Sequence, residues 1–335
     1  MDGEGRGFVL HTREGESELD IDEVRAMADS GDPDGLYALS MAYLFGWDVD
    51  EDQEKGYMYL EKAVAAGQTE AMTLMVRLFM QGEYQGIGPE RAAELSITAA
   101  RDGIPDAQLY AGLAYMDGIS VPKDYAEAVR LFRLAANQGS SEARTNLAYM
   151  MQEGLGTKKD EAKAFTLYRT AARSGNVNAM FHLAVCHEFG VGTNKDLPSA
   201  AEWYGKGAEQ GDAFAMERLG FLWSEGIGDS DPDPEKAFEW FLRAAMEGVT
   251  SAMTTVGRCY LDGYGTGKDS EEAAKWLKMA ADNGDEEASR LLSGIRGQAF
   301  SSSSGTITDT IWFSIPQAAS WASIGPIEAP LSVMK

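Results

Sequence analysis

The sequence predicts an all-α fold, a right-handed α-solenoid of about 15 to 16 helices arranged as helix-turn-helix units. The first observation behind this is a glycine that follows an Ala-rich run and returns after 36 residues six times and after 37 residues once. The glycines of this first series are Gly31, Gly67, Gly103, Gly139, Gly175, Gly211, Gly248 and Gly284. A regular period of this length is typical of a repeat array, in which each period is one supersecondary unit.

A second glycine series keeps the same period and divides each unit into two segments of helical length. It consists of Gly46, Gly82, Gly118, Gly154, Gly190, Gly226 and Gly263. Its one 37-residue step falls in the same part of the chain, so the extra residue lies in the loop at 226–238. Two series that stay in phase indicate copies of one structural unit.

The first helix of each unit is expected to begin about two residues after the first-series glycine, where capping side chains stand. These are Asp32, Ser140, Asn176, Asp212 and Asp285. Pro33 and Pro105 occupy the first helical position, where an N–H would have no partner in any case. The helix then runs to the second-series glycine, which can adopt the positive φ that ends a helix.

A short loop and a capping aspartate lead into the second helix of each unit. The aspartates are Asp124, Asp160, Asp196 and Asp269. Inside the second helix an alanine column is followed by two columns of large residues: Leu131, Leu167, Trp203, Trp240 and Trp276, and beside them Phe132, Tyr168, Tyr204, Phe241 and Leu277. Small residues allow helices to approach and large ones fill the neighbouring gap, so these columns predict the core. The unit at 67–102 fits least well, because it has Gly88-Pro89 and places Ser96 in the aromatic column.

The stretch Gly263-Tyr264-Gly265-Thr266-Gly267-Lys268 looks at first like a phosphate-binding loop. A phosphate loop follows a strand, and its lysine is followed by Ser or Thr; here a helix precedes and Asp269 follows. GLGTKKD at 154–160 and GVGTNKD at 190–196 occupy the same place in other units. The stretch is therefore interpreted as the turn between the two helices of a repeat.

These motifs resemble the Sel-1-like repeat, a 36-residue relative of the tetratricopeptide repeat. The resemblance is carried by A-x-x-L-A-x-x-Y-x-x-G (Ala107 to Gly118), by G-x-G-T-x-K-D, and by A-x-x-W-x-x-K-A-A-x-x-G (Ala273 to Gly284, with Met279 in place of the usual basic residue). It covers about residues 20–297. The resemblance implies a scaffold for protein complexes, used in protein quality control, signalling and host–microbe contacts.

One secreted bacterial subgroup of this family pairs two cysteines within each repeat, and some members are linked to β-lactam binding or hydrolysis. This sequence departs from that pattern, because Cys186 and Cys259 stand at equivalent positions two repeats apart. Helices that pack roughly 8–10 Å apart per layer place them on the order of 20 Å apart, whereas a disulfide requires Cα atoms within about 7 Å. No bridge between them is expected.

The predicted domain organisation has three parts. Residues 1–17 are expected to be a flexible leader, 18–298 the solenoid, and 299–335 a low-charge, Ser-rich tail that is disordered or lies along the solenoid as a short apolar segment. Within the solenoid we expect a half-unit helix at 18–30, with Ser17 as its cap, and a terminal helix at 284–298. The seven full repeats, numbered first to seventh, are 31–66, 67–102, 103–138, 139–174, 175–210, 211–247 and 248–283.

Counting back from the second-series glycine identifies a candidate binding groove on the first helices. Positions −9 and −5 share a helical face but vary in chemistry from repeat to repeat. A face that repeats in geometry but not in residue type suits one extended or helical peptide, although large residues there would also serve to pack adjacent repeats. The candidate groove residues are Tyr37, Met41, Thr73, Arg77, Leu109, Leu113, Thr145, Tyr149, Phe181, Val185, Glu217, Phe221 and Arg258.

The charge of the chain narrows the class of partner. The formal net charge is −24, and 299–335 contribute only Asp309, Glu328 and Lys335 to it. Such a field repels nucleic acid and anionic membranes, so a protein or peptide ligand is expected instead, and the field favours a basic one. Position −12 holds Asp34, Glu70, Asp106 and Glu142, which either stabilise helix N-termini or form an acidic rim for a basic ligand. The chain is expected to be a monomer by itself.

The sequence offers little for catalysis or metal binding. His182 and Cys186 share a helical face, with His187 and Glu188 beside them, but Cys186 and His187 occupy core columns. We therefore expect no enzyme activity, cofactor or metal, and take a protein-interaction scaffold as the main hypothesis. The alternatives are a hydrolase like the cysteine-rich subgroup, with His182 as its best candidate, and an adaptor anchored to a membrane by the uncharged residues 310–327. The N-terminus contains no secretory signal, which favours the cytoplasm.

Overall fold

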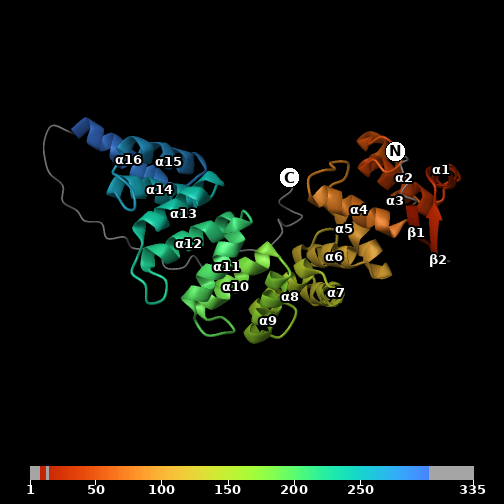
Figure 1. Ribbon diagram of the computed structural model, residues 1–335, viewed down its shortest axis with the longest axis horizontal. Coiled ribbons are helices and arrows are strands. Elements are labelled where there is room, and N and C mark those ends of the chain that lie inside the picture. Colours follow the sequence, from red (N-terminus) through yellow and green to blue (C-terminus); the bar gives the residue numbers. More distant parts are fainter. Residues whose placement is uncertain (1–7, 13–14, 302–335) are drawn as a thin grey trace, which may run out of the picture. The chain divides into compact units, whose positions relative to one another are not determined.

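The computed structural model of the chain describes residues 8–12 and 15–301, and it confirms the predicted all-α solenoid of helix pairs (Figure 1). The first helices of the repeats are α2 (Pro33–Phe45), α4 (Thr69–Met80), α6 (Pro105–Asp117), α8 (Ser141–Glu153), α10 (Val177–Phe189), α12 (Ala213–Glu225) and α14 (Thr250–Asp262). The second helices are α3 (Gln53–Ala65), α5 (Pro89–Ala99), α7 (Tyr125–Asn137), α9 (Glu161–Arg173), α11 (Leu197–Glu209), α13 (Pro234–Met246) and α15 (Ser270–Asp282). A 3₁₀ turn, η1 (Ala100–Asp102), continues α5, and α1 (Ile21–Asp29) and α16 (Glu286–Ser301) stand at the two ends.

The chain divides into two compact units whose boundary crosses α8 and the loop after it. The first unit contains α1 to α7 and α8 as far as Met150, and the second contains 151–153 and the chain from Lys159 through α16.

The N-terminal segment differs from the flexible leader that we expected. Strands β1 (Phe8–Thr12) and β2 (Gly15–Leu19) form an antiparallel pair in which Phe8 lies opposite Leu19. Ser17 is part of β2, so it does not cap α1; the Asp20 side chain does, and Glu23 completes a capping box. Residues 1–7 and 13–14 of the leader, and 302–335 of the predicted tail, lie outside the described residues.

The predicted caps are confirmed in both helices of the repeats. The side chains of Asp32, Ser140, Asn176 and Asp212 accept backbone N–H bonds at the starts of first helices, and Asp285 accepts one from Ala288 at 2.8 Å. The side chains of Asp124, Asp160, Asp196 and Asp269 do the same for second helices. These side chains therefore define where their helices begin, whereas α5, α6 and α14 begin without a side-chain cap.

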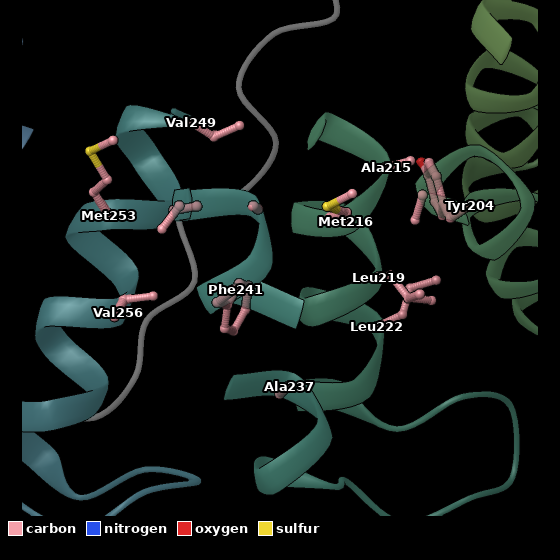
Figure 2. Packing of buried hydrophobic residues seen from close by; sticks show 14 of the residues in the cluster. Tyr204, Ala215, Met216, Leu219, Leu222, Ala237, Phe241, Val249, Met253 and Val256 are labelled. Carbon is pink, nitrogen blue, oxygen red and sulfur yellow. The ribbon is translucent and has the colours of Figure 1, made fainter. Parts of the chain in front are cut away.

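In every repeat except the second, the core forms where a small residue of the first helix meets a large residue of the second. A Cβ added to Gly112 would lie 2.6 Å from the Phe132 ring, and one added to Gly220 would lie 2.7 Å from the Phe241 ring. In Figure 2 Phe241 projects between α12, which carries Leu219 and Leu222, and α14, which carries Val256. One aromatic ring thus seals the contact of its own repeat and that of the next.

The glycine-rich turn has a packing role. Gly265 has φ +68°, and a Cβ there would overlap the backbone carbonyl of Pro234 at the start of the preceding second helix. Gly192 is placed in the same way against the carbonyl of Glu161. The turn needs glycine at this position for backbone conformation and for close approach to the previous repeat.

Candidate functional site

Water-exposed side chains on the first helices follow one stripe along the helix. In α12 the stripe consists of Phe214, Arg218, Phe221 and Glu225, at i, i+4, i+7 and i+11. Phe214 is 64% exposed, Arg218 and Phe221 are half-buried, and Glu225 is exposed. Counted from the second-series glycine, these are positions −12, −8, −5 and −1.

Neighbouring first helices extend this stripe within the second unit, although the −8 and −5 residues of α10 are buried. We call the resulting surface the first-helix face. It comprises Phe189 of α10, Phe214, Arg218, Phe221 and Glu225 of α12, and Arg258 and Asp262 of α14. Phe189 is 42% exposed although it is a large apolar residue.

The predicted groove residues are only partly on this face. Six of them are buried between helices and cannot line an open surface: Thr73, Leu109, Leu113, Thr145, Phe181 and Val185. The others are half-buried: Tyr37, Met41, Arg77, Tyr149, Glu217, Phe221 and Arg258. Position −9 is rotated about 60° from position −12, which places it at the edge of the stripe, against the adjoining repeat. Position −5 lies nearer the centre.

Sequence reasoning missed Phe189, Phe214 and Arg218. Phe214 and Phe189 stand at positions −12 and −1, seven residues before and four residues after the −5 column. Extending the −5 column along the helix by those steps would have found them, because i, i+7 and i+11 share one face of a helix. The core columns did not indicate how each first helix is rotated relative to the helices on either side of it, and this rotation decides which of its residues are exposed.

Arg218 is the centre of a polar network between three helices of the second unit. Its guanidinium pairs with Glu188 of α10, and Tyr204 of α11 donates a hydrogen bond of 2.8 Å to the other carboxylate oxygen of Glu188. Burial and the charge of Glu188 raise the pKa of Tyr204, so its hydroxyl remains a donor. The guanidinium carbon also lies 5.6 Å from the Phe189 ring centre and 5.5 Å from that of Phe221. The face is therefore held in place by a partly buried ion pair and two cation–π contacts.

Further ion pairs join first helices of successive repeats. Arg77 of α4 lies 3.8 Å from Asp106 of α6, and Arg258 of α14 lies 3.1 Å from Glu287 of α16. In both pairs a −5 arginine meets a −12 carboxylate of the next first helix. Part of the predicted acidic rim thus contributes to contacts between repeats, while Glu70 and Glu142 remain exposed.

The residues considered for catalysis or metal binding have separate partners. The His182 ring stacks on Tyr168 with ring centres 4.9 Å apart, and burial lowers its pKa to about 4. Burial raises the pKa of Cys186 to about 12, which disfavours the thiolate, and His187 packs edge-on against Phe165. Cys186 and Cys259 are both free and buried. His182 therefore occupies the core and does not face a cleft.

Two properties of the described residues bear on the hypotheses of a metal site and of a membrane anchor. Within 8–12 and 15–301, no three or more His, Cys, Asp or Glu side chains gather as ligands for a metal ion. No helix in the same part of the chain is long and apolar enough to cross a membrane. The membrane-anchor hypothesis concerned 310–327, which lie outside the described residues.

Comparison with known protein families identifies the family to which this chain belongs. The Sel1 repeat family model matches residues 33–68, 105–140, 141–176, 177–212, 213–249 and 250–285, which together are more than half of the chain. The protein belongs to the Sel1 repeat family. The residues between the first two matches, 69–104, correspond closely to the second repeat, the one whose sequence fits least well. No curated protein sequence matched the chain.

Two solved structures show the same fold. One is c5321, a protective antigen present in uropathogenic Escherichia coli strains that displays an SLR fold, with 28% identity and a TM-score of 0.64. The alignment covers 85% of this chain but 62% of that one. The other is a Sel1 repeat protein from Oxalobacter formigenes, with 27% identity, a TM-score of 0.64, and 82% of this chain and 79% of that one covered. Sel1 repeat proteins commonly act as non-catalytic protein-interaction scaffolds.

Proposed function

We propose that this protein is a non-enzymatic scaffold that holds a peptide segment of a partner protein on the first-helix face. The observation that carries the proposal is the two phenylalanine rings exposed to water there, Phe189 and Phe214. The half-buried ring of Phe221 and the anchored guanidinium of Arg218 lie on the same face. Aromatic and arginine side chains supply much of the binding energy at protein interfaces. Rings held on rigid helices lose little conformational freedom when a ligand binds.

The test is selection of random twelve-residue peptides on phage against the immobilised full-length chain. Peptides that survive are then measured against purified variants by fluorescence anisotropy. The variant Phe189→Ser with Phe214→Ser removes two exposed rings of the face. Its matched control, Met246→Ser with Met279→Ser, removes two exposed apolar residues of α13 and α15.

We expect selected peptides to bind the wild-type chain and the control equally, and to bind the Phe189→Ser/Phe214→Ser variant at least tenfold more weakly, a loss of about 1.4 kcal/mol or more. Phe181→Ala is unsuitable for this test, because Phe181 packs against Tyr204 in the core and its loss would disturb the fold. A selection without enriched peptides, or peptides that bind all variants equally, would contradict the proposal.

A further inference from the structure

Glu217 is an unusual residue on the edge of the first-helix face. It lies on α12 one turn after Phe214 and one turn before Phe221, and its Oε1 atom is buried without a hydrogen-bond partner. Burial raises the pKa of this carboxyl, although a hydrogen bond with Ser251 of α14 and the charge of Arg218 act in the opposite direction. A buried carboxylate oxygen without a partner destabilises the free protein, and a cation held close to the carboxylate would offset part of that cost through its charge.

The two arginines of the first-helix face already have carboxylate partners. Arg218 pairs with Glu188, and Arg258 pairs with Glu287. Within the part of the chain that the structure describes, Glu217 forms no ion pair with a lysine or arginine. Arg218 acts on the Glu217 carboxyl through its charge but forms no ion pair with it, so no lysine or arginine of the described residues is paired with this group.

The surroundings of Glu217 also favour a cation. The exposed ring of Phe214 attracts ammonium and guanidinium groups, as the ring of Phe221 already does with Arg218. At the last position of the first helices in the second unit stand the exposed acids Glu153, Glu225 and Asp262. With a net charge of −24 on the whole chain, this surface lies in a negative field that draws basic ligands toward it.

We propose that Phe214, Glu217 and Phe221 of α12, together with Ser251 of α14, receive a lysine or arginine side chain from a basic peptide segment. The inference rests on the docking function proposed above and specifies the charge of the ligand. A side chain of this kind lays its aliphatic stem along the rings and brings its charged end to the Glu217 carboxylate. The contact is a charge-assisted hydrogen bond in partly dry surroundings.

The preference for a basic side chain can be tested with three fluorescein-labelled peptides. They have the sequence Gly-Ser-Leu-X-X-Leu-Ser-Gly, in which X is Lys, Gln or Glu. Binding to the full-length chain is followed by anisotropy at one fixed ionic strength. We expect the Lys peptide to bind at least tenfold more tightly than the Gln peptide, and the Glu peptide to bind most weakly. Equal affinities, or no binding of the Lys peptide, would overturn the inference.

Variants separate the Glu217 contact from the general negative field. Glu217→Gln keeps the shape of the side chain and should remove the preference for Lys over Gln. Glu239→Gln removes an equal charge from an exposed position on α13 and should change the affinity less than twofold. Phe214→Ser, on a ring 64% exposed, should weaken the Lys peptide at least threefold, whereas Met246→Ser should not.

The outcomes also distinguish this inference from the function on which it rests. If Glu217→Gln and Glu239→Gln weaken the Lys peptide equally, the site is refuted, while phage-selected peptides that need Phe189 and Phe214 would still support docking. If circular dichroism shows that Glu217→Gln is poorly folded, the comparison of Phe214→Ser with Met246→Ser tests the site instead. Equal binding of the Lys peptide by these two variants would then refute it. If neither the Lys peptide nor any selected peptide binds, both proposals fall.

Discussion

The second repeat (67–102) and the sixth repeat (211–247) build the same helix pair from opposite packing choices. In the sixth repeat a small residue of the first helix, Gly220, lies against the large ring of Phe241 on the second helix. The equivalent positions of the second repeat hold Val76 and Ser96, both fully buried. The larger side chain has moved from the second helix to the first. The contact between the helices therefore requires one large and one small partner, and either helix can supply the large one.

The turns of the two regions differ as well. Two residues after the second-series glycine, most repeats have a positive φ, whether at Gly156 and Gly265 or at the non-glycines Asp48 and Ser120. The second repeat has Tyr84 there, with its ring buried 5.0 Å from that of Tyr57 and its hydroxyl donating to Glu61 at 2.5 Å. A side chain thus attaches this turn to the preceding repeat. Other turns, such as that of Gly265, contact the preceding repeat through closely approaching backbone instead. Residues 69–104, which carry these departures, lie outside the family match although both helices are present.

Exchanging the packing pair should have the largest effect. Phe241→Ser in the sixth repeat removes a fully buried ring and should cost about 4 kcal/mol of unfolding free energy. Gly220→Val forces a branched side chain into the same ring and should cost about 2–3 kcal/mol. The double variant copies Val76 and Ser96, so it should lose at least about 1 kcal/mol less than the sum. Urea unfolding followed by circular dichroism measures the loss of unfolding free energy in all three variants. If the loss of the double variant equals the sum of the two single losses, exchanging the large and small partners does not restore the contact, and the two repeats are packed on different principles.

Acid should weaken the fifth repeat (175–210) in a way that the second repeat avoids. His182 is buried, and its pKa falls to about 4 from an ordinary value near 6.5; Leu74 holds the same position in the second repeat. Because the unfolded chain binds the proton more readily, the stability from neutral His182 is complete above pH 6.5 and declines toward pH 4, by about 3 kcal/mol in all.

His182→Leu tests this prediction by introducing the residue of the second repeat. Many carboxylates also titrate in this range, so the informative quantity is the difference between wild type and variant, measured by urea unfolding at pH 7 and pH 4.5. We expect the wild type to lose about 2–3 kcal/mol more than His182→Leu over that interval. Parallel losses would mean that His182 becomes protonated without unfolding.

The turn glycine that the second repeat lacks should be costly to replace. Gly265→Ala places a Cβ against the Pro234 carbonyl at φ +68°, so it should lower the free energy of unfolding by about 2 kcal/mol. Gly267→Ala, two residues later, meets nothing within 4 Å and should change it by less than about 0.5 kcal/mol. Comparing the two thermal transitions checks both expectations, and equal shifts would assign the effect to loss of glycine in general.

The sequence was a good guide wherever a structural requirement is local. The period, the capping side chains and the columns of alanine and large residues depend on contacts within a few residues or within one helix pair. The structure confirms the period, the predicted caps, the buried alanine column and the buried column from Phe132 to Leu277, whereas Trp203, Trp240 and Trp276 of the other column are half-buried. Ser96 marked the second repeat as deviant, but its complement Val76 was not recognised, because a swap between two helices appears only when the columns are read together. The β1–β2 pair was missed because the short run Phe8-Val9-Leu10 looked like part of an acidic leader.

The site was harder to predict because exposure depends on three helices at once. Phe181 looks like a groove residue by its position, yet it is 6% exposed, because the second helix of its own repeat covers it with Tyr204. Phe214 looks unremarkable at a helix start, yet it is the most exposed phenylalanine among the described residues. The Glu188–Arg218 pair joins residues 30 apart, and helical periodicity alone does not specify such a pairing.

The smallest expected effect concerns the Tyr84 hydroxyl in the turn of the second repeat. Tyr84→Phe keeps the ring against Tyr57 and removes only the donor to Glu61, whose carboxylate is exposed and regains water. The loss should therefore be about 1 kcal/mol, near the middle of the range for a single hydrogen bond. Tyr57→Phe is the matched control, because its hydroxyl donates to the Glu83 carbonyl at 3.0 Å in an exposed setting and should matter less. If Tyr84→Phe leaves the urea midpoint unchanged, the ring alone fastens this turn, and the hydroxyl contributes nothing to replacing the absent glycine.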